Sequence, residues 1–386
     1  MTTESMSGGA FEMENGTGPG AIVRHLYVHI PFCARICPYC AFYKERTESS
    51  QIARFCRALL GELEAVNRWF ELQPTTIFFG GGTPTALSSA QLETVLSGCQ
   101  ERLDLSVLQE WTIEANPGSV SPRKAALLKT CGVTRVSLGV QSWDDALLTL
   151  LGREHNAAQA EASFQILREA AIQSLNIDLM FGLPHQSLAQ WEATLARTVA
   201  LRPDHISAYC LTYEQDTEFF LRQSRGEYRT DIETDARFFE TTVHILEAAG
   251  YAHYEISNYA RTGHESVHNR AYWAGEDYLG LGPSAFSTIG GERWQNVPDY
   301  RTYDDRVLAG RSPVASTEPL SAEMKRAEQI ALSLRTRWGV PAEWLAPWPA
   351  ERAEFIELGL LRPREERLVL THKGKLLADS VAAAFV

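Results

Sequence analysis

The chain alternates six times between a short run of β-forming residues and a helical segment, and this alternation constrains its fold more than any other feature. Strands that alternate with helices form a parallel sheet with the helices outside it. Six units are too few to close a standard eight-unit barrel, so we expect an α/β fold built as an open, partial (β/α)6 barrel. The predicted strands are His25–Ile30, Thr76–Phe79, Trp111–Glu114, Arg135–Val140, Asn176–Met180 and His205–Leu211.

The segments between these strands carry helix signals. A helix is expected to open at Ser88 or Ser89, and another at Ser121 followed by Pro122, an N-cap with proline at the first helical position. The first helix is indicated by apolar residues at spacings of three and four. These residues are Ile52, Phe55, Leu59, Leu63, Val66 and Phe70.

Composition divides the chain further. Residues 254–288 are rich in aromatic residues and glycine and are expected to be irregular, whereas 367–371 predicts a short strand and Lys373-Gly374 a turn. We therefore expect a smaller C-terminal α+β domain that resembles a winged helix, with simple packing on the barrel as the plainer alternative. The predicted divisions are a disordered segment at 1–22, the core at 23–260, a connecting segment at 261–319 and the C-terminal domain at 320–386.

Charge and cysteine usage exclude several classes of protein. The formal net charge of −12 argues against general nucleic-acid binding through phosphates. The N-terminus lacks a basic and then apolar signal peptide, and no apolar run reaches the length of a membrane span, so we expect a cytoplasmic protein. Three of the seven cysteines lie within eight residues, which indicates a cluster site rather than a secreted disulfide framework.

Cys33, Cys37 and Cys40 lie in a C-x3-C-x2-C loop directly after the first strand. Soft thiolates suit an iron–sulfur cluster or zinc. Closed clusters and structural zinc sites normally have four protein ligands, so three local cysteines leave one coordination position open for chemistry. The alternative is zinc, with His25 or His29 as the fourth ligand.

The cysteine loop resembles that of the radical S-adenosylmethionine (radical SAM) superfamily. The resemblance implies a [4Fe–4S] cluster on these cysteines, with the amino and carboxylate groups of S-adenosylmethionine on the open iron. An electron from the cluster can then cleave the cofactor to a 5′-deoxyadenosyl radical. By the same resemblance, Tyr39 packs on the adenine side, and Gly81, Gly82 and Thr83 belong to the segment that holds the methionine amino group.

Other candidate cofactor contacts lie on or after the predicted strands. Glu114 ends the third strand, where a carboxylate can accept hydrogen bonds from two ribose hydroxyls. Each candidate has a plainer structural reading; Arg153 and Asp178, for example, could form an ordinary ion pair. The candidates are Tyr27, Glu114, Gln141, Arg153 and Asp178.

Several stretches narrow the resemblance to the oxygen-independent coproporphyrinogen III oxidase group. The decarboxylating oxidases carry a further cysteine where this chain has Phe42, and they have a longer N-terminal segment than the 32 residues that precede Cys33 here. The chain more closely resembles the HemW branch of heme chaperones, marked by an H-N-x-x-Y-W motif, which is present at 268–273. The stretches are 80–85, 137–143, 151–156, 176–184 and 254–259.

The motif implies heme binding. A histidine such as His268 can ligate heme iron, and Tyr272 and Trp273 can cover a porphyrin face. His253, His264 and the cysteines are alternative ligands. The expected function is heme binding and transfer to an acceptor protein that the sequence does not identify. The alternatives are a coproporphyrinogen III oxidase, a radical enzyme with an unrelated substrate, and a purely structural metal protein.

Overall fold

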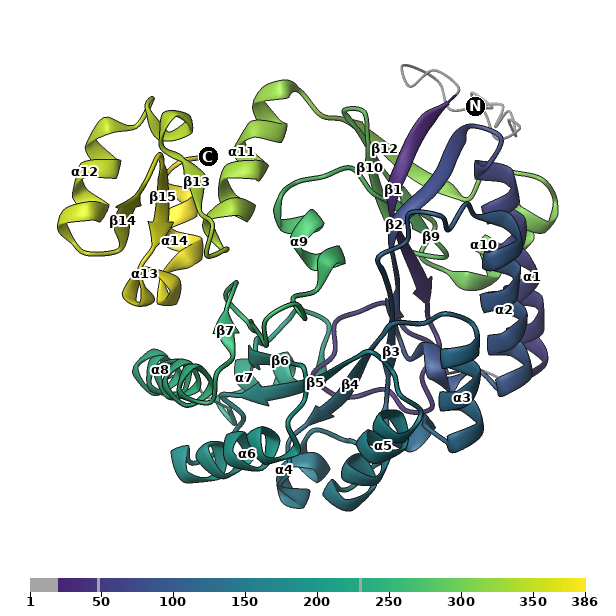
Figure 1. The fold of residues 1–386 in the computed structure, drawn as a ribbon, viewed down its shortest axis with the longest axis horizontal. Helices are drawn as coiled ribbons and strands as arrows, with labels where there is room; N and C mark the ends of the chain where they lie inside the picture. Colours follow the sequence, from purple (N-terminus) through teal and green to yellow (C-terminus); the bar gives the residue numbers. More distant parts are fainter. Residues whose placement is uncertain (1–19, 47–48, 229–230) are drawn as a thin grey trace.

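The computed structural model describes residues 20–46, 49–228 and 231–386, so nearly all of the predicted disordered segment lies outside the described residues. Figure 1 shows a curved sheet with helices along its outer face. Within the described residues this sheet has nine strands, in the order β7-β8-β6-β5-β4-β3-β2-β1-β9. It ends at β7 on one edge and β9 on the other and does not close, so the predicted open, partial barrel is confirmed.

Six of the strands are parallel and follow the predicted order. They are β1 (Ala21–Ile30), β2 (Phe70–Gly81), β3 (Glu110–Ala115), β4 (Arg135–Gln141), β5 (Ser174–Phe181) and β6 (His205–Cys210). The sequence did not reveal the three short additions. β9 (Leu279–Leu281) pairs in parallel with β1, while β8 (Asn258–Ala260) and β7 (Ala252–His253) continue the other edge in antiparallel pairing.

The helices that cover the sheet begin where the sequence indicates. Ser88 caps α2 in a capping box with Gln91, and Ser121 caps α3 ahead of Pro122. These helices are α1 (Ser49–Val66), α2 (Ser89–Arg102), α3 (Pro122–Thr130), α4 (Asp145–Leu150), α5 (Ala157–Glu169), α6 (Leu188–Leu201), α7 (Glu218–Ser224) and α8 (Ile232–Ala248). Short 3-10 turns, Pro84–Ala86 and Pro117–Ser119, follow β2 and β3.

One prediction about the first helix is wrong. The apolar spacing extends to Phe70, but α1 ends at Val66 and the chain turns before Phe70 opens β2. The ring of Phe70 then packs on that of Trp294, with ring centroids 6.4 Å apart. Because Phe70 is buried in either position, its spacing could not distinguish the end of a helix from the start of a strand.

Side chains along the strands alternate between two faces of the sheet. One face packs in the hydrophobic core, and the other, inner face is polar. Ile77, Ile113, Val136 and Ile177 are fully buried and belong to the main hydrophobic core together with residues of α1, α2, α3, α5, α6 and α8. The intervening side chains point inward because successive residues of a strand face opposite sides of the sheet. Many of them are polar: Thr112, Glu114, Arg135, Ser137, Asn176, Asp178, His205 and Ser207. The inner face is therefore available for binding.

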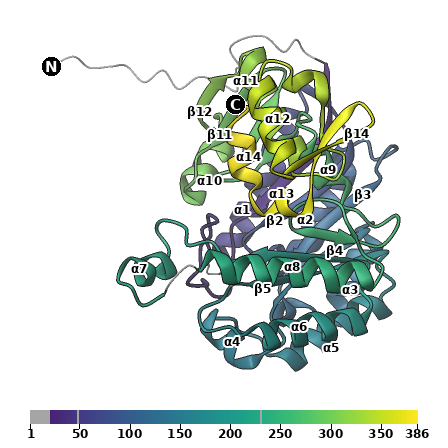
Figure 2. The same ribbon diagram turned by 90° about the vertical axis from the view of Figure 1, so that its left-hand side faces the viewer.

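The rest of the chain forms smaller layers. A second sheet contains β10 (Phe286–Ile289), β11 (Glu292–Asn296) and β12 (Val314–Pro319), with α10 (Tyr300–Leu308) packed against α1. The C-terminal elements have their own hydrophobic core and group on one side of the molecule (Figure 2). They are α11 (Ala322–Leu334), β13 (Val340–Pro341), a 3-10 turn (Ala342–Leu345), α12 (Pro349–Glu357), β14 (Leu361–Arg364), β15 (Arg367–Leu370), α13 (His372–Leu376) and α14 (Ala378–Ala383).

The C-terminal elements agree with the expected winged-helix-like mixture of helices and a three-stranded antiparallel sheet. Two local predictions are wrong. Lys373-Gly374 lies inside α13, because the side chain of Thr371 caps the helix by accepting from Gly374 N. The segment 254–288 is not irregular throughout, since it contains α9 (Val267–Trp273) as well as short strands. Among the described helices, none combines the length and apolarity needed to cross a membrane.

Candidate functional site

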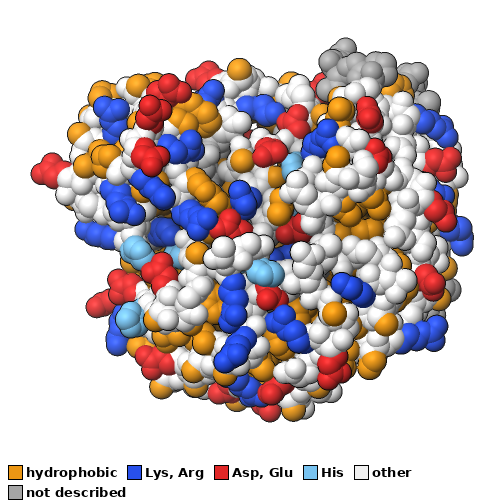
Figure 3. Space-filling model, in the orientation of Figure 1, with side chains coloured by type: hydrophobic (Ala, Val, Ile, Leu, Met, Phe, Trp, Pro, Cys, Tyr) orange, Lys and Arg blue, Asp and Glu red, His pale blue; other side chains and the backbone are white. Residues whose placement is uncertain are grey.

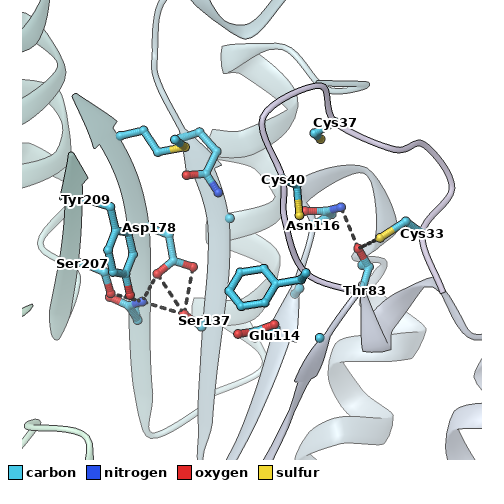
Figure 4. A pocket seen from close by; sticks show the side chains of 18 of the residues that line it. Cys33, Cys37, Cys40, Thr83, Glu114, Asn116, Ser137, Asp178, Ser207 and Tyr209 are labelled. Carbon is cyan, nitrogen blue, oxygen red and sulfur yellow. Dashed lines mark hydrogen bonds between the residues drawn. The ribbon is translucent and has the colours of Figure 1, made fainter. Parts of the chain in front are cut away.

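A cavity of about 520 Å³ occupies the inside of the curved sheet. It extends from the cysteine loop at the carboxyl ends of the strands to Arg135 and His205, which open β4 and β6. Figure 4 shows the three cysteines on one side of it and Asp178, Ser207 and Tyr209 on the other. Eleven of the sequence candidates line this cavity: Cys33, Cys37, Tyr39, Cys40, Gly81, Gly82, Thr83, Glu114, Gln141, Arg153 and Asp178.

The cysteine loop is held at both ends by backbone hydrogen bonds. Cys33 N donates to Glu45 O (3.0 Å), and Glu45 N donates to Pro31 O (2.7 Å). All three thiols are partly exposed to the cavity. Burial raises the pKa of the Cys33 thiol. The loop thus presents three sulfurs to one cavity without a disulfide between them.

The glycine turn after β2 packs directly against this loop. Gly82 N donates to Ile30 O and Thr83 N to Phe32 O, each at 2.8 Å. A Cβ on Gly82 would lie within 2.9 Å of backbone atoms of the cysteine loop, and Gly81 has a φ of +103°. The glycines are therefore needed for the two loops to approach each other, which is a second reason for them besides access to a ligand.

Arg153 connects the cysteine loop to the neighbouring strand ends. Its guanidinium donates to Cys37 Sγ (3.6 Å), Gly139 O (2.7 Å) and Asn116 Oδ1. Asn116 Nδ2 donates to Thr83 Oγ1 (2.9 Å), which in turn lies 3.6 Å from Cys33 Sγ. Arg153 Nε is buried without a hydrogen-bond partner among the described residues. The alternative reading of Arg153 as the ion-pair partner of Asp178 is wrong, because its contacts lie on the cysteine side.

Two buried carboxyl groups face the middle of the cavity. Burial, and then the nearby Asp178, raise the pKa of Glu114 to about 8. Burial also raises the pKa of Asp178, although Ser137 Oγ (2.9 Å) and Asn176 Nδ2 (2.7 Å) donate to it. Such groups can accept from ligand hydroxyls when ionised and donate when protonated, so they suit a polyhydroxylated ligand.

Gln141 lines the cavity, whereas Tyr27 does not. Gln141 ends β4 with a φ of 68°, beside a register shift between β4 and β5. Left-handed backbone is unfavourable for a side chain and concentrates at binding sites. Tyr27 does not line the cavity; its hydroxyl hydrogen-bonds His29 Nδ1 (3.0 Å), and its ring stacks on Phe78. Tyr27 therefore supports the wall of the cavity from the side, next to its register partner Phe78.

Sequence reasoning missed several lining residues. Asn116 directly follows β3 and was not assigned a role, although it joins Arg153 to Thr83. The others alternate with apolar residues along β4, β5 and β6, so the period-two pattern of these strands contained the signal. They are Ser137, Asn176, Ser207 and Tyr209.

The donor set fits a cluster better than a single zinc ion. Within the described residues, no three Cys, His, Asp or Glu side chains are placed to share one metal ion. In a [4Fe–4S] cluster each thiolate binds a different iron, so its sulfurs stay farther apart than the ligands of one ion. The proposed zinc ligands are engaged elsewhere: the ring nitrogens of His25 bond Thr76 and Glu276, and those of His29 bond Tyr27 and Tyr43.

The H-N-x-x-Y-W motif lies at the opposite, amino end of the sheet, on α9. His268 is only 9% exposed, its Nδ1 lies 2.8 Å from Thr76 Oγ1, and its ring stacks on Phe78. Burial lowers the pKa of His268 to about 3. Glu110 caps this helix, accepting from Val267 N (2.9 Å) and His268 N (3.0 Å). His268 is therefore a neutral, packed histidine in this structure.

The two aromatic residues of the motif have different surroundings. Tyr272 is 45% exposed, whereas Trp273 lines a second cavity of about 550 Å³ with Trp338. The indole Nε1 of Trp273 is buried without a partner among the described residues. Arg24, Arg270 and Arg367 line the same cavity. Figure 3 shows Lys and Arg side chains gathered where the C-terminal elements meet the rest of this face.

The other candidate heme ligands differ in their hydrogen bonds and exposure. His253 Nε2 bonds Ile256 O (3.0 Å), and its ring stacks on Tyr259. His264 Nδ1 lies 3.3 Å from Ser174 Oγ. Of the remaining cysteines, only Cys210 is exposed, and it lines the cavity beside β6.

Comparison with known proteins gives consistent matches. The profile of the radical SAM superfamily matches residues 27–198. The heme chaperone HemW of Bacillus subtilis is 36% identical over 94% of this chain and 99% of its own length. The HemW of Mycobacterium tuberculosis is 37% identical over 92% of this chain and 93% of its own length. The HemW of Escherichia coli is 32% identical over 94% of this chain and 97% of its own length. The coproporphyrinogen III oxidase HemN of Escherichia coli, described as a radical SAM enzyme, shares the fold: its TM-score is 0.81 at 24% identity, over 95% of this chain and 90% of its own.

Proposed function

From the premise that this chain belongs to the radical SAM superfamily, and within it to the HemW family of heme chaperones, we propose that it binds heme and transfers it to an acceptor protein. The observation that carries the proposal is the similarity to heme chaperones along almost the whole length of both chains. The fold shared with the oxidase carries no function by itself.

The cofactors implied by the family are a [4Fe–4S] cluster, S-adenosylmethionine and heme. Cys33, Cys37 and Cys40 would hold the cluster. When the cluster and S-adenosylmethionine are both bound, the cluster supplies an electron for cleavage of the sulfonium. Arg153 holds the Cys37 side of the loop and places a positive charge beside the thiolates. Glu114 is positioned to accept from hydroxyls of the cofactor, and Tyr39 and Gln141 complete the wall on that side.

The hydrogen bonds of His268 support its assignment as a heme ligand. His25 Nε2 lies 2.9 Å from the Glu276 carboxylate, and His25 Nδ1 lies 2.9 Å from the Thr76 hydroxyl. A hydroxyl has one proton: when Thr76 donates it to His25 Nδ1, the Thr76 oxygen accepts from His268 Nδ1–H (2.8 Å). The remaining Nε2 of His268 then carries a lone pair, which is the form that ligates iron.

Access to His268 requires a change at the amino end. His268 lines neither of the two cavities, and the ring lies under α9 against Phe78. Heme iron can reach Nε2 only if α9 shifts. Tyr272 and Trp273 lie on the same helix and would then cover a porphyrin face.

The oxidase is the second candidate, because the cavity combines the thiol loop with the two buried carboxyl groups that a radical enzyme of this fold would use. Phe42 argues against it. This side chain is 71% exposed at the rim of the cavity, in the position where the oxidases carry their further cysteine.

The two candidates can be separated on one sample. Protein reconstituted anaerobically should bind heme in about one-to-one ratio by absorbance titration and should convert no coproporphyrinogen III. His268→Ala should weaken heme binding and leave the iron–sulfur spectrum unchanged, while His264→Ala should leave both unchanged. Measurable decarboxylation would support the oxidase, and absence of heme binding by the wild type would contradict the chaperone.

We further propose that the protein acts in the cytoplasm and meets a basic acceptor. Its net charge is −12, and an acidic surface attracts a basic partner at long range. The rate of transfer to the acceptor should then fall as the salt concentration rises.

A further inference from the structure

The floor of the main cavity, at the end away from the cysteines, contains a buried arginine without an acid partner. Arg135, the first residue of β4, is 4% exposed. Its Nη1 donates to Ser174 Oγ (3.1 Å) and His264 O (3.0 Å). In the part of the chain that the structure describes, its Nε and Nη2 have no hydrogen-bond partner, and no carboxylate forms an ion pair with it.

A buried hydroxyl without a partner lies directly beside it. Thr112 on β3 is the register partner of Arg135, and both side chains line the cavity. Thr112 is fully buried, and its Oγ1 has no hydrogen-bond partner among the described residues. Buried polar groups are almost always hydrogen-bonded. This exception, in a cavity wall beside an arginine without an ion pair, therefore indicates a binding position.

The acidic groups nearest the guanidinium are hydrogen-bonded to other partners and form no ion pair with it among the described residues. Glu110 is engaged by the first turn of α9, and Asp178 by Ser137 and Asn176. Burial raises the pKa of Asp178, which favours its uncharged form. Burial also lowers the pKa of His205 well below its usual range, so this neighbour is neutral. A buried charge normally has a counter-charge, and here a ligand can supply it.

We propose that Arg135 and Thr112 form a subsite for the carboxylate of a small organic acid, separate from the S-adenosylmethionine position. A guanidinium fork binds a carboxylate with two parallel hydrogen bonds, and the threonine hydroxyl adds a third donor. The apolar part of the acid would lie against Phe78, which lines the same cavity. The subsite does not depend on the heme function.

The proposed subsite lies far from the expected position of the methionine carboxylate of S-adenosylmethionine. Arg135 and Gln141 are the first and last residues of β4, and six steps of a strand span about 20 Å. The methionine carboxylate of the cofactor belongs at the cysteine end. It would have to cross the whole cavity to reach Arg135, so the floor remains free for a second ligand.

Propionate and its uncharged analogue propionamide are suitable probes. Saturation-transfer NMR titrations would use the reconstituted full chain at constant ionic strength, without and with saturating S-adenosylmethionine. We expect propionate to bind at least tenfold more tightly than propionamide under both conditions. Equal binding of the two probes would mean that the floor holds structural water only and would overturn the proposal. Displacement of propionate by S-adenosylmethionine would assign the anion site to the cofactor and would overturn it as well.

Variants locate the binding to the two side chains. Arg135→Met should weaken propionate binding at least tenfold, whereas Arg123→Met, on the exposed surface of α3, should not change it. Because Arg135 also bonds His264 O, its variant is compared with Thr112→Val, which removes a hydroxyl that has no partner. Thr112→Val should raise the melting temperature of the free protein and weaken propionate binding several-fold. Unchanged propionate binding in Thr112→Val, or in a folded Arg135→Met, would overturn the subsite.

Discussion

The two ends of the central sheet both carry a conspicuous motif, but they are organised in opposite ways. At the carboxyl end, the thiols of Cys33, Cys37 and Cys40 face an open cavity, and Arg153 Nε has no partner in the part of the chain that the structure describes. At the amino end, His268 is stacked, hydrogen-bonded and covered by α9, which Glu110 caps. The carboxyl end is therefore ready to receive a ligand, whereas the position of His268 at the amino end must first open.

This difference predicts different effects of substitution at the two ends, on ligand binding at one and on stability at the other. Glu114 and Asp178 in the cavity have raised pKa values, and Thr112 Oγ1 has no partner among the described residues, so substitution of these groups should mainly affect ligands. His268 of the motif is hydrogen-bonded and packed, so its substitution should affect the fold as well as any ligand. Each prediction below tests one side of this contrast.

The largest effect is expected at the cysteine loop. Cys33→Ala, Cys37→Ala and Cys40→Ala should each abolish the visible absorption of the reconstituted cluster, because each thiolate binds a different iron. Cys131→Ala, at a buried position outside the cavity, is the matched control and should keep it. A complete [4Fe–4S] spectrum in all three loop variants would rule out this cluster site.

At the amino end, His268→Ala should lower the free energy of unfolding by about 2–4 kcal/mol, because it empties a packed position and removes a buried hydrogen bond. Tyr272→Ala on the same helix should cost less than about 1 kcal/mol, since Tyr272 is 45% exposed. Urea unfolding of both variants measures the difference. Equal stability of the two would mean that His268 is not part of the packing that closes this end.

Glu114→Ala should weaken S-adenosylmethionine binding by about 1.5–3 kcal/mol, the range for hydrogen bonds to a charged group. Equilibrium dialysis with the reconstituted protein measures the loss, and Glu101→Ala on the exposed side of α2 is the control. The pKa of Glu114 is about 8, so wild-type affinity should also rise as the pH increases through that value and the carboxylate forms. A pH-independent affinity would mean that Glu114 does not accept from the cofactor.

The comparison also explains which features could be predicted from sequence. The strands and the C-x3-C-x2-C loop depend on local patterns, and the strand ends bring Glu114 and Gln141 together because parallel strands end at one edge. The position of His268 depends on Thr76, which lies 192 residues away, so no local pattern could show that the ring is packed. Arg135 was predicted only as the start of a strand, because the absence of an acid partner is a property of the folded chain.

The smallest predicted effect is a change in how the free energy of unfolding depends on pH. This dependence comes from the titration of buried histidines. Burial lowers the pKa of His268 and of His253 to about 3, against a value near 6.5 in the unfolded chain. A histidine that is neutral only when folded contributes stability that is complete above about pH 6.5 and is lost as the pH falls toward its folded pKa. Each such group should therefore cost about 1.4 kcal/mol per pH unit over this interval.

Urea unfolding between pH 7.5 and pH 5 measures the slope of stability against pH. The wild type should lose stability as the pH falls, and His268→Ala should lose about 1.4 kcal/mol less per pH unit below about pH 6.5, because one proton-binding group is absent from its unfolded state. Tyr272→Ala should keep the wild-type slope, since it leaves every histidine in place. If His268→Ala also keeps that slope, then His268 titrates normally in the folded protein, the amino end is already open to solvent, and heme would need no movement of α9 to reach it.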